Sequence, residues 1–395
     1  MLRVGIIGCG KIADVHASQI QAIGGCEIVG VCDREELMAR QLAERFRVPQ
    51  YFTDVAEFLK SRKPDVVHIT TPPQSHFEIA RFCLEHGCHV YVEKPFTLRA
   101  WETEELIEWA NAKSLKLTAG HDAQFSHASR RMRQLVREGY LGGPPVHLES
   151  LWCYQLSGNA YAKSFLGAKR HWVTGLPGGL LHNIISHGIA KLAEFLATDS
   201  PTVLAHGFVS LMLRGLGEKE IIDELRVSIF DGDRTTAHFT FSSQMRPSVH
   251  QFRIYGPENG VVVDEDRQTV IKLSGAKYKS YLETFIPPLD LARQYVGNVW
   301  RNAKLFLARD FQMESGMRSL IQAFYHSVTQ NESVPIPYPE ILLTARIMDD
   351  IFQQLGSQCP LDQSAVRIAG EPSEVRRACL HQNIVVLAGR DDGNE

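Results

Sequence analysis

Near its amino end the sequence reads Leu2-Arg3-Val4-Gly5-Ile6-Ile7-Gly8-Cys9-Gly10-Lys11-Ile12-Ala13, and this stretch predicts how the first part of the chain folds. Its apolar first half predicts a buried strand, and its G-x-G-x-x-A spacing predicts a tight turn into a helix. Gly8 permits the turn, Gly10 lets the backbone approach a pyrophosphate, and Ala13 allows close helix–strand packing. A pyrophosphate would face the amino end of the helix. The stretch therefore predicts a dinucleotide-binding turn.

A second strand is expected over 27–32, and it ends in Asp33, 25 residues after Gly8. An acid at this place suits the adenosine ribose hydroxyls and favours NAD. The neighbouring Arg34 carries a guanidinium suited to a 2′-phosphate, so NADP remains an alternative. Asp33 has a structural interpretation as well, as the N-cap of a helix over 35–46.

Strands and helices continue to alternate up to residue 120. Further strands are expected over 65–70, 89–92 and 115–119, with helices from His76 to Glu85 and over about 101–113. No two of these strands are joined by a hairpin turn, so they need crossover connections. The pattern predicts a doubly wound parallel sheet for residues 1–120.

The strand 89–92 runs into Glu93-Lys94-Pro95. Proline cannot donate to a sheet ladder, so the strand must end there. Glu93 and Lys94 then lie at a carboxyl end of the sheet, where open α/β sheets bind ligands. The alternative is an ordinary exposed strand exit. The loop from Thr71 to His76 comes after the preceding strand and should also pass the cofactor, unless His76 is a first-turn helix residue without a ligand.

From residue 121 to 395 the pattern changes to a second, α+β domain. Amphipathic helices are expected over 126–138 and 178–196, and the chain from 281 to 355 is expected to be helical, with a flexible tail over about 382–395. No crossover helices separate the expected strands, so they predict a large, mostly antiparallel open sheet. The strands are expected over 146–154, 202–213, 224–230, 235–242, 251–255, 260–264 and 269–273.

Composition excludes several classes of protein. The 395 residues are 44% hydrophobic and 22% charged, with a formal net charge of −3, which gives no electrostatic case for nucleic acid. No apolar run is long enough for a transmembrane segment, and the amino end does not resemble a signal peptide. The eight cysteines show neither a Cys-x-x-Cys pair nor a zinc spacing. We therefore expect reduced thiols, a cytoplasmic protein and no metal.

At this point the chain resembles the Gfo/Idh/MocA family of NAD(P)-dependent oxidoreductases, over residues 1 to about 350. The motifs that carry the resemblance are Gly8-x-Gly10-x-x-Ala13, Thr71-Pro72 with His76, Glu93-Lys94-Pro95, and Gly178-Gly179 followed by His187. The resemblance implies a Rossmann domain followed by a domain with a large open sheet, through which a homo-oligomer would form. It implies hydride transfer between nicotinamide and a hydroxyl or keto carbon of a sugar, cyclitol or nucleotide-sugar.

The resemblance also implies roles for three residues. Lys94 would hydrogen-bond the reacting oxygen, Pro95 would be cis and aim Lys94, and His187 would be the acid or base. Many members carry an aspartate where this chain has Asn183. Asn183 and His187 are four apart, hence on one helix face. An amide cannot take a proton, so His187 and Lys94 would have to carry the proton chemistry.

The expected site has two sets of residues. The cofactor would contact the glycine turn and three strand ends: Gly8, Gly10, Lys11, Ile12, Ala13, Asp33, Arg34, Thr71, Pro72, His76, Glu93 and Lys94. The substrate would contact Lys94, Tyr154, Arg170, Trp172, Asn183 and His187. Arg170 would bind a carboxylate or phosphate or be a plain surface arginine, and Tyr154 would stack on a sugar or simply pack. His182 is expected to be structural.

The stretch 291–309 carries apolar residues and four basic residues but no acid. A basic amphipathic helix lies on an anionic membrane surface or meets a partner subunit. We favour a helix that packs its apolar side in the core and keeps its basic face in water.

Two other functions remain in view beside a sugar dehydrogenase. One is a glycosidase that uses NAD for transient oxidation and cleaves a glycosidic bond by elimination. The other is a nucleotide-binding protein without turnover, suggested by Asn183 and by the basic stretch.

Overall fold

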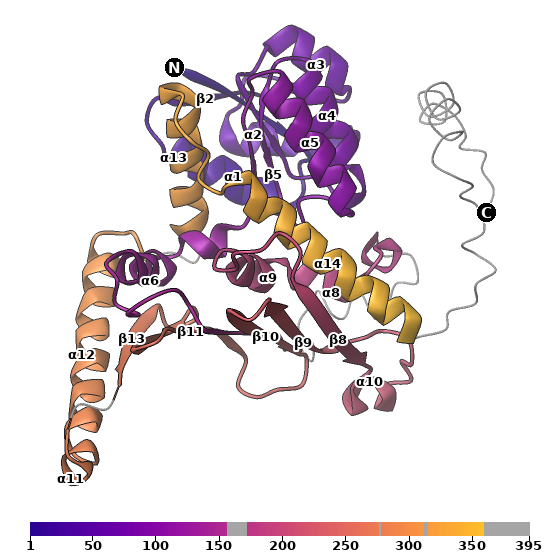
Figure 1. Ribbon diagram of the computed structural model, residues 1–395. Coiled ribbons are helices and arrows are strands. Elements are labelled where there is room, and N and C mark those ends of the chain that lie inside the picture. The colour runs from indigo at the N-terminus through magenta and orange to yellow at the C-terminus, as the bar shows by residue number, and fades with distance from the viewer. Residues whose placement is uncertain (156–171, 276–277, 312–314, 359–395) are drawn as a thin grey trace. The chain divides into compact units, whose positions relative to one another are not determined.

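Six parallel strands form the first sheet, in the order β3-β2-β1-β4-β5-β6 (Figure 1). In the computed structural model, which describes residues 1–155, 172–275, 278–311 and 315–358, these strands are β1 (Leu2–Ile7), β2 (Cys26–Cys32), β3 (Tyr51–Phe52), β4 (Val66–Ile69), β5 (His89–Val92) and β6 (Leu117–Ala119). All four residues of β4 are buried, as expected for a parallel strand covered on both faces. The predicted doubly wound sheet is confirmed; the two-residue strand β3 was not foreseen.

Helices cover both faces of this sheet and carry local start and stop signals. They are α1 (Lys11–Gln21), α2 (Glu36–Phe46), α3 (Val55–Arg62), η1 (Pro73–Ser75), α4 (His76–Glu85) and α5 (Ala100–Ala112). The Asp54 carboxylate accepts from the backbone N–H of Glu57 and so caps α3. Gly87, at φ +80°, ends the turn after α4.

A helix from the far end of the chain completes the first core. Helix α13 (Ser315–Gln330) buries Leu320, Phe324 and Tyr325 among the apolar side chains of the parallel sheet. Although α13 lies within residues 121–395 of the sequence, it packs into the core of the first sheet. The boundary at residue 120 itself stays a prediction.

The second sheet has seven strands in the order β13-β12-β11-β7-β10-β9-β8. The strands are β7 (His147–Cys153), β8 (Thr202–Phe208), β9 (Glu224–Asp231), β10 (Thr235–Ser242), β11 (Val249–Tyr255), β12 (Asn259–Asp264) and β13 (Thr269–Ser274). Neighbours pair antiparallel except β7 with β10, which are parallel. The mostly antiparallel open sheet predicted from the turns is confirmed.

Helices pack against one face of this second sheet and share a core with it. The other helices in the described part of the chain are η2 (Asp122–Phe125), α6 (His127–Arg137), η3 (Trp172–Gly175), α8 (Gly179–Ile184), α9 (Ser186–Ala193), α10 (Leu211–Gly215), α11 (Ser280–Glu283), α12 (Ile286–Leu307) and α14 (Tyr338–Gln358). Met1–Leu355 form one compact unit by their contacts. No helix in the described ranges has the length and apolarity needed to cross a bilayer.

Two expected elements have different boundaries in the structure. The strand expected over 202–213 ends at Phe208, because Ser210 caps a new helix, α10, by accepting from the N–H of Leu213. The helix expected over 178–196 is divided at Ile185 into α8 and α9. Asn183 and His187 therefore belong to successive short helices, although Ile185 itself keeps a right-handed helical backbone.

The interpretation favoured for 291–309, a helix with its apolar side in the core, is wrong. Of the described side chains in α12, Asn298 alone is buried, while Val296, Val299 and Trp300 are 57%, 66% and 67% exposed. The helix turns its polar side to strand β13, and this placement leaves the apolar side facing outward. Arg170 and the tail 382–395 lie outside the described residues.

Candidate functional site

The glycine turn after β1 is shaped by close backbone packing. Gly8 has φ +93°, and a Cβ there would lie 2.6 Å from the backbone N of Thr71, so no other residue fits. A Cβ on Gly10 would meet no atom within 4 Å, which leaves open space at the amino end of α1. Lys11 and Ile12 are exposed beside it, whereas Ala13 is fully buried. A pyrophosphate could therefore come close to the backbone N–H groups of this turn.

Asp33 ties the glycine turn to the end of β2. Its carboxylate accepts from the N–H of Cys9 at 2.6 Å and from the N–H of Glu35 at 2.9 Å. The N-cap of α2 is Glu35, so Asp33 is not the cap. Each carboxylate oxygen keeps a lone pair for a ribose hydroxyl. The Arg34 side chain is 88% exposed and lies 3.9 Å from the carboxylate of Glu35.

His76 joins the loops that follow β4 and β5. Its ring is buried, with Nδ1 2.9 Å from the carbonyl of Pro95 and Nε2 2.9 Å from the carbonyl of Thr71. Burial lowers the pKa of His76, although the two carbonyls act in the opposite direction. Both ring nitrogens of His76 are thus engaged by backbone carbonyls, and the ring links the two loops.

Lys94 reaches from the end of β5 to the second half of the chain. The Lys94–Pro95 peptide bond is cis, as the resemblance implied. The Lys94 ammonium donates to the backbone carbonyl of Asn183 at 3.1 Å. Its backbone N–H donates to Glu93 Oε2 at 3.2 Å. The end of β5 and helix α8 are therefore joined by this ammonium.

His187 lies beside a carboxyl group that the sequence argument did not identify. Its Nδ1 is 3.6 Å from Asp122 Oδ1, at the start of η2, slightly beyond hydrogen-bond distance. The side chains keep 15% and 25% of their surfaces accessible, respectively. The ring of His121 lies 6.3 Å from the ring of His187. Together with Lys94, these three side chains form what we term the open cluster.

The electrostatics of the open cluster follow from burial next to charge. Burial and then the charge of the Glu93 carboxylate raise the pKa of Asp122 to about 7, and Lys94 opposes this shift. Burial, followed by the charge of Lys94, lowers the pKa of His187 well below its usual range. Burial likewise lowers the pKa of His121 to about 4. Near neutral pH both imidazoles are therefore uncharged, and the carboxyl group is close to its titration point.

A second group of polar side chains, which we term the closed chain, lies behind Glu93. Glu93 Oε1 is 2.9 Å from His16 Nε2, the Nδ1 atoms of His16 and His68 are 2.8 Å apart, and His68 Nε2 is 2.8 Å from the Tyr325 hydroxyl. All four residues are buried. Burial raises the pKa of Glu93, but the His16 hydrogen bond and the neighbouring positive charges outweigh it, so the net pKa is lowered.

Aromatic side chains border His187 on the sheet side. The Trp152 ring lies 5.7 Å from the His187 ring, and the His250 ring lies between Trp152, at 4.5 Å, and Tyr154, at 5.4 Å. Tyr154 is 42% exposed. Trp172, at the start of η3, accepts from the Gln74 amide through its backbone carbonyl.

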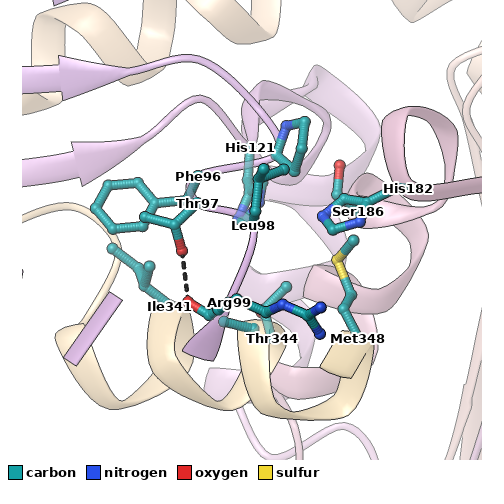
Figure 2. A pocket seen from close by; sticks show the side chains of 12 residues that line it. Phe96, Thr97, Leu98, Arg99, His121, His182, Ser186, Ile341, Thr344 and Met348 are labelled. Atoms are coloured by element: carbon teal, nitrogen blue, oxygen red, sulfur yellow. Dashed lines mark hydrogen bonds between the residues drawn. The ribbon is translucent and has the colours of Figure 1, made fainter. Parts of the chain in front are cut away.

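A small pocket adjoins the open cluster through His121 (Figure 2). It is enclosed by the loop Pro95–Arg99, by His182 and Ser186, and by α14. His182 stacks on Phe352 at 4.5 Å, and burial lowers its pKa to about 4. This placement agrees with the structural role expected for His182. Metal ligands are not gathered here: the described part of the chain contains no group of three candidate ligands that could hold an ion.

Some site residues were within reach of sequence reasoning and others were not. His121 and Asp122 follow β6, the neighbour of β5, so the argument that selected Glu93 and Lys94 applies to them as well. Trp152 and His250 sit on adjacent strands whose pairing the sequence does not specify. His16 lies on the buried side of a helix, and nothing in the pattern separates it from a core residue.

Residues 2–121 match the family model described as the Gfo/Idh/MocA oxidoreductase family with an NAD-binding Rossmann fold. The D-glucoside 3-dehydrogenase of Escherichia coli is 35% identical over 142 residues, which are 36% of this chain and 40% of that protein. The UDP-N-acetylglucosamine 3-dehydrogenase of Acidithiobacillus ferrooxidans is 34% identical over 149 residues, 38% of this chain and 44% of that protein. The chain thus matches less than half the length of these relatives.

A solved structure extends the likeness to both sheets. The WlbA dehydrogenase from Bordetella pertussis, in complex with NADH and UDP-GlcNAcA, superimposes with a TM-score of 0.72. The match covers 91% of this chain and 98% of that one at 14% sequence identity. At this identity the likeness establishes the fold alone.

The first sheet, its glycine turn and the family match together show an NAD-binding Rossmann fold over residues 2–121. The match to the Gfo/Idh/MocA family thus covers residues 2–121, the part of the chain that carries this first sheet.

Proposed function

We propose that the protein transfers a hydride between NAD and a hydroxyl or keto carbon of a sugar, a cyclitol or a nucleotide-sugar. The observation that carries this proposal is the open cluster: Lys94, Asp122 and His187 come together at the carboxyl ends of β5 and β6, at the edge of the parallel sheet where the glycine turn also lies. Relatives named as dehydrogenases of a glucoside and of a nucleotide-sugar support the substrate class.

Bound NAD supplies the hydride acceptor for oxidation, or the donor for reduction, and the chain's residues handle the proton. His187 is the general base in oxidation, because its lowered pKa keeps the imidazole neutral and able to accept the hydroxyl proton. The Lys94 ammonium polarises the same oxygen and stabilises the developing alkoxide charge. The cofactor contacts proposed from the sequence are retained, with NAD favoured by Asp33.

Asp122 extends this mechanism. In oxidation His187 gains a charge, and an ionised carboxylate 3.6 Å from its Nδ1 would stabilise the imidazolium. Asn183 cannot do so, because an amide carries no charge. We therefore assign to Asp122 the charge-stabilising role that an aspartate at position 183 would otherwise have.

A substrate panel tests the function. Nucleotide sugars, free sugars and cyclitols are each incubated with NAD, and the formation of NADH is followed by absorbance. We expect NADH production with at least one hydroxyl substrate and its absence in the Lys94→Ala variant. Cleavage of a glycoside without net NADH would instead indicate transient oxidation and elimination. Binding of NAD without turnover of any substrate in the panel would contradict the proposal.

A further inference from the structure

Helix α12 is amphipathic, with its polar side facing the protein. Gln294, Asn298 and Asn302 succeed one another at intervals of four residues and face β13, the edge strand of the second sheet. The side-chain amide of Gln294 pairs with both the N–H and the carbonyl of Lys272, at 2.7 and 3.1 Å. That of Asn298 pairs in the same way with Val270, at 3.1 and 3.0 Å.

These amides take the place of another strand. An edge strand presents unpaired N–H and carbonyl groups, and covering it with a helix is one way to protect it. Asn302 continues the series by donating to the carbonyl of Arg267 at 2.8 Å. Figure 1 shows α12 running alongside β13 at the edge of the sheet. The helix is thus anchored by hydrogen bonds through its polar side.

The opposite side of α12 carries a stripe of large apolar side chains in water. Leu289, Val296, Trp300 and Leu307, spaced by seven, four and seven residues, are 70%, 57%, 67% and 80% exposed. These intervals place them on one helix face. Val299 and Phe306 extend the stripe on one flank and are equally open. An exposed apolar surface of this kind marks an interaction site.

Charge identifies the class of partner. Arg293, Arg301, Lys304 and Arg309 lie in 291–309, which contains no acid, and among the described residues none of them forms an ion pair. The acids at the two ends are engaged within the chain: Asp290 accepts from Gln294, and Asp310 lies 3.3 Å from His127. The surface is therefore both apolar and positively charged.

We propose that α12 lies on an anionic lipid surface, with its apolar stripe in the interfacial region and its basic residues among the headgroups. Interfacial helices have this combination of a Trp-, Leu- and Phe-containing face beside Lys and Arg. A second copy of the chain is a poorer partner, because pairing α12 with itself would bring together two sets of basic residues without acids between them. The inference does not depend on the substrate of the enzyme.

Vesicle co-sedimentation with the full-length protein tests the proposal. The probes are vesicles of phosphatidylglycerol mixed with phosphatidylcholine, compared with vesicles of phosphatidylcholine alone. We expect the wild type to sediment with the anionic vesicles and to be partly released by salt, which screens the charge contribution. The double variant W300E/L307E should lower the partition coefficient by about tenfold or more, because two charges enter the apolar stripe.

A matched control keeps the charge change but moves it elsewhere. Leu211 and Leu216, at α10, are 81% and 67% exposed, close to the 80% and 67% of Leu307 and Trp300. L211E/L216E should bind anionic vesicles like the wild type, and thermal melting should show both double variants folded. A third variant, R293Q/K304Q, should lose the preference for anionic over neutral vesicles.

Two outcomes would overturn the proposal. The first is a wild type that does not bind anionic vesicles, and the second is equal binding by both glutamate variants. If the first outcome is accompanied by a change in oligomeric mass in W300E/L307E, measured by light scattering, the stripe is a subunit interface.

Discussion

Two groups of buried polar side chains flank Lys94, and they differ in how fully the protein satisfies them. In the closed chain from Glu93 to Tyr325, each of the three links between neighbouring side chains is a hydrogen bond of 2.8–2.9 Å. In the open cluster, His121 finds no partner for either ring nitrogen within the described structure, and neither does His187 for Nδ1.

The difference separates positioning from reaction. Buried polar groups in proteins are nearly always paired, so a fully paired chain contributes rigidity, and an unpaired group indicates a place kept for something else. Here the closed chain fixes Glu93, which accepts from the backbone N–H of Lys94, and the open cluster includes the Lys94 ammonium, whose charge acts on His187. The same strand end thus has a rear side whose polar groups are paired within the protein, and a front side with unpaired groups, where we propose that the reaction takes place.

The largest effect is expected from the front side. Lys94→Ala and His187→Ala should each lower kcat by on the order of 100-fold or more, because one removes charge stabilisation and the other the proton acceptor. NAD affinity should stay nearly unchanged. Steady-state kinetics with the substrate found in the panel, together with an NAD titration, measures both quantities. Lys113→Ala, on an exposed lysine, is the control, and equal activity of all three variants would contradict the mechanism.

Substitutions in the closed chain, on the rear side, should lower the stability of the protein rather than its kcat. His68→Phe keeps the stacking on Tyr91, whose ring lies 4.6 Å away, but leaves His16 Nδ1 and the Tyr325 hydroxyl without a partner. Two buried groups left unpaired should lower the free energy of unfolding by about 2–4 kcal/mol. Tyr325→Phe breaks one link and should cost about half as much. Chemical denaturation measures the loss, and a collapse of kcat at unchanged stability would show that the closed chain takes part in proton transfer.

Asp122 connects structure to pH dependence. Its pKa of about 7 means that the carboxylate needed beside His187 forms as the pH rises through neutrality. The oxidation rate should therefore rise through an apparent pKa near 7. Asp122→Asn should lower kcat by about tenfold above that pH and abolish this rise. A pH profile of kcat that keeps the same midpoint in the variant would remove Asp122 from the mechanism.

The same variant has a matching effect on stability. Because the pKa of Asp122 in the folded state lies above the ordinary value of 3.8, its ionisation lowers stability by an amount that grows above about pH 4 and is complete above about pH 7. The cost disappears below about pH 4, where both states are protonated. Asp122→Asn should therefore raise the melting temperature at pH 8 and leave it unchanged at pH 4.

The sequence predicted the residues of the front side, Lys94 and His187, better than the closed chain behind them. Lys94 is placed by a strand end and a proline, and these are local signals that fix its position in any parallel sheet. His187 came from resemblance, since nothing local to Gly178–Gly179 requires it to face Lys94. The closed chain joins residues as far apart as His16 and Tyr325, so only the tertiary fold brings them together.

The direction of α12 shows a different limit. Its pattern predicts an amphipathic helix, and the helix exists, but periodicity does not say which side faces the protein. The usual choice, apolar side inward, fails here because the neighbour is a sheet edge with unsatisfied backbone groups. The amide side chains of Gln294, Asn298 and Asn302, at intervals of four residues, would have indicated that the polar side faces the protein.

A substitution at Asp33 tests whether a carboxylate that already accepts hydrogen bonds within the protein can also bind NAD. Its carboxylate already accepts from two backbone N–H groups. Asp33→Ala removes both these bonds and the contact proposed with the ribose, so NAD should bind more weakly by about 1–3 kcal/mol. Fluorescence titration with NAD and with NADP measures this, with Arg34→Ala as the companion variant. Tighter binding of NADP than of NAD by the wild type would show that Arg34 sets the preference.

The smallest effect is expected at Asn183, and it tests the assignment of Asp122 directly. Lys94 binds the backbone carbonyl of Asn183, so a change of side chain leaves that hydrogen bond in place. Asn183→Asp alone should change kcat by less than about threefold and move the rise of the oxidation rate to higher pH, because an added carboxylate favours the protonated forms of both Asp122 and His187. In the Asp122→Asn background the same change should restore part of the lost activity, since a carboxylate is supplied again four residues before His187. The pH profiles of both single variants and the double variant decide this. A double variant no better than Asp122→Asn would mean that the two positions do not act on His187 in the same way.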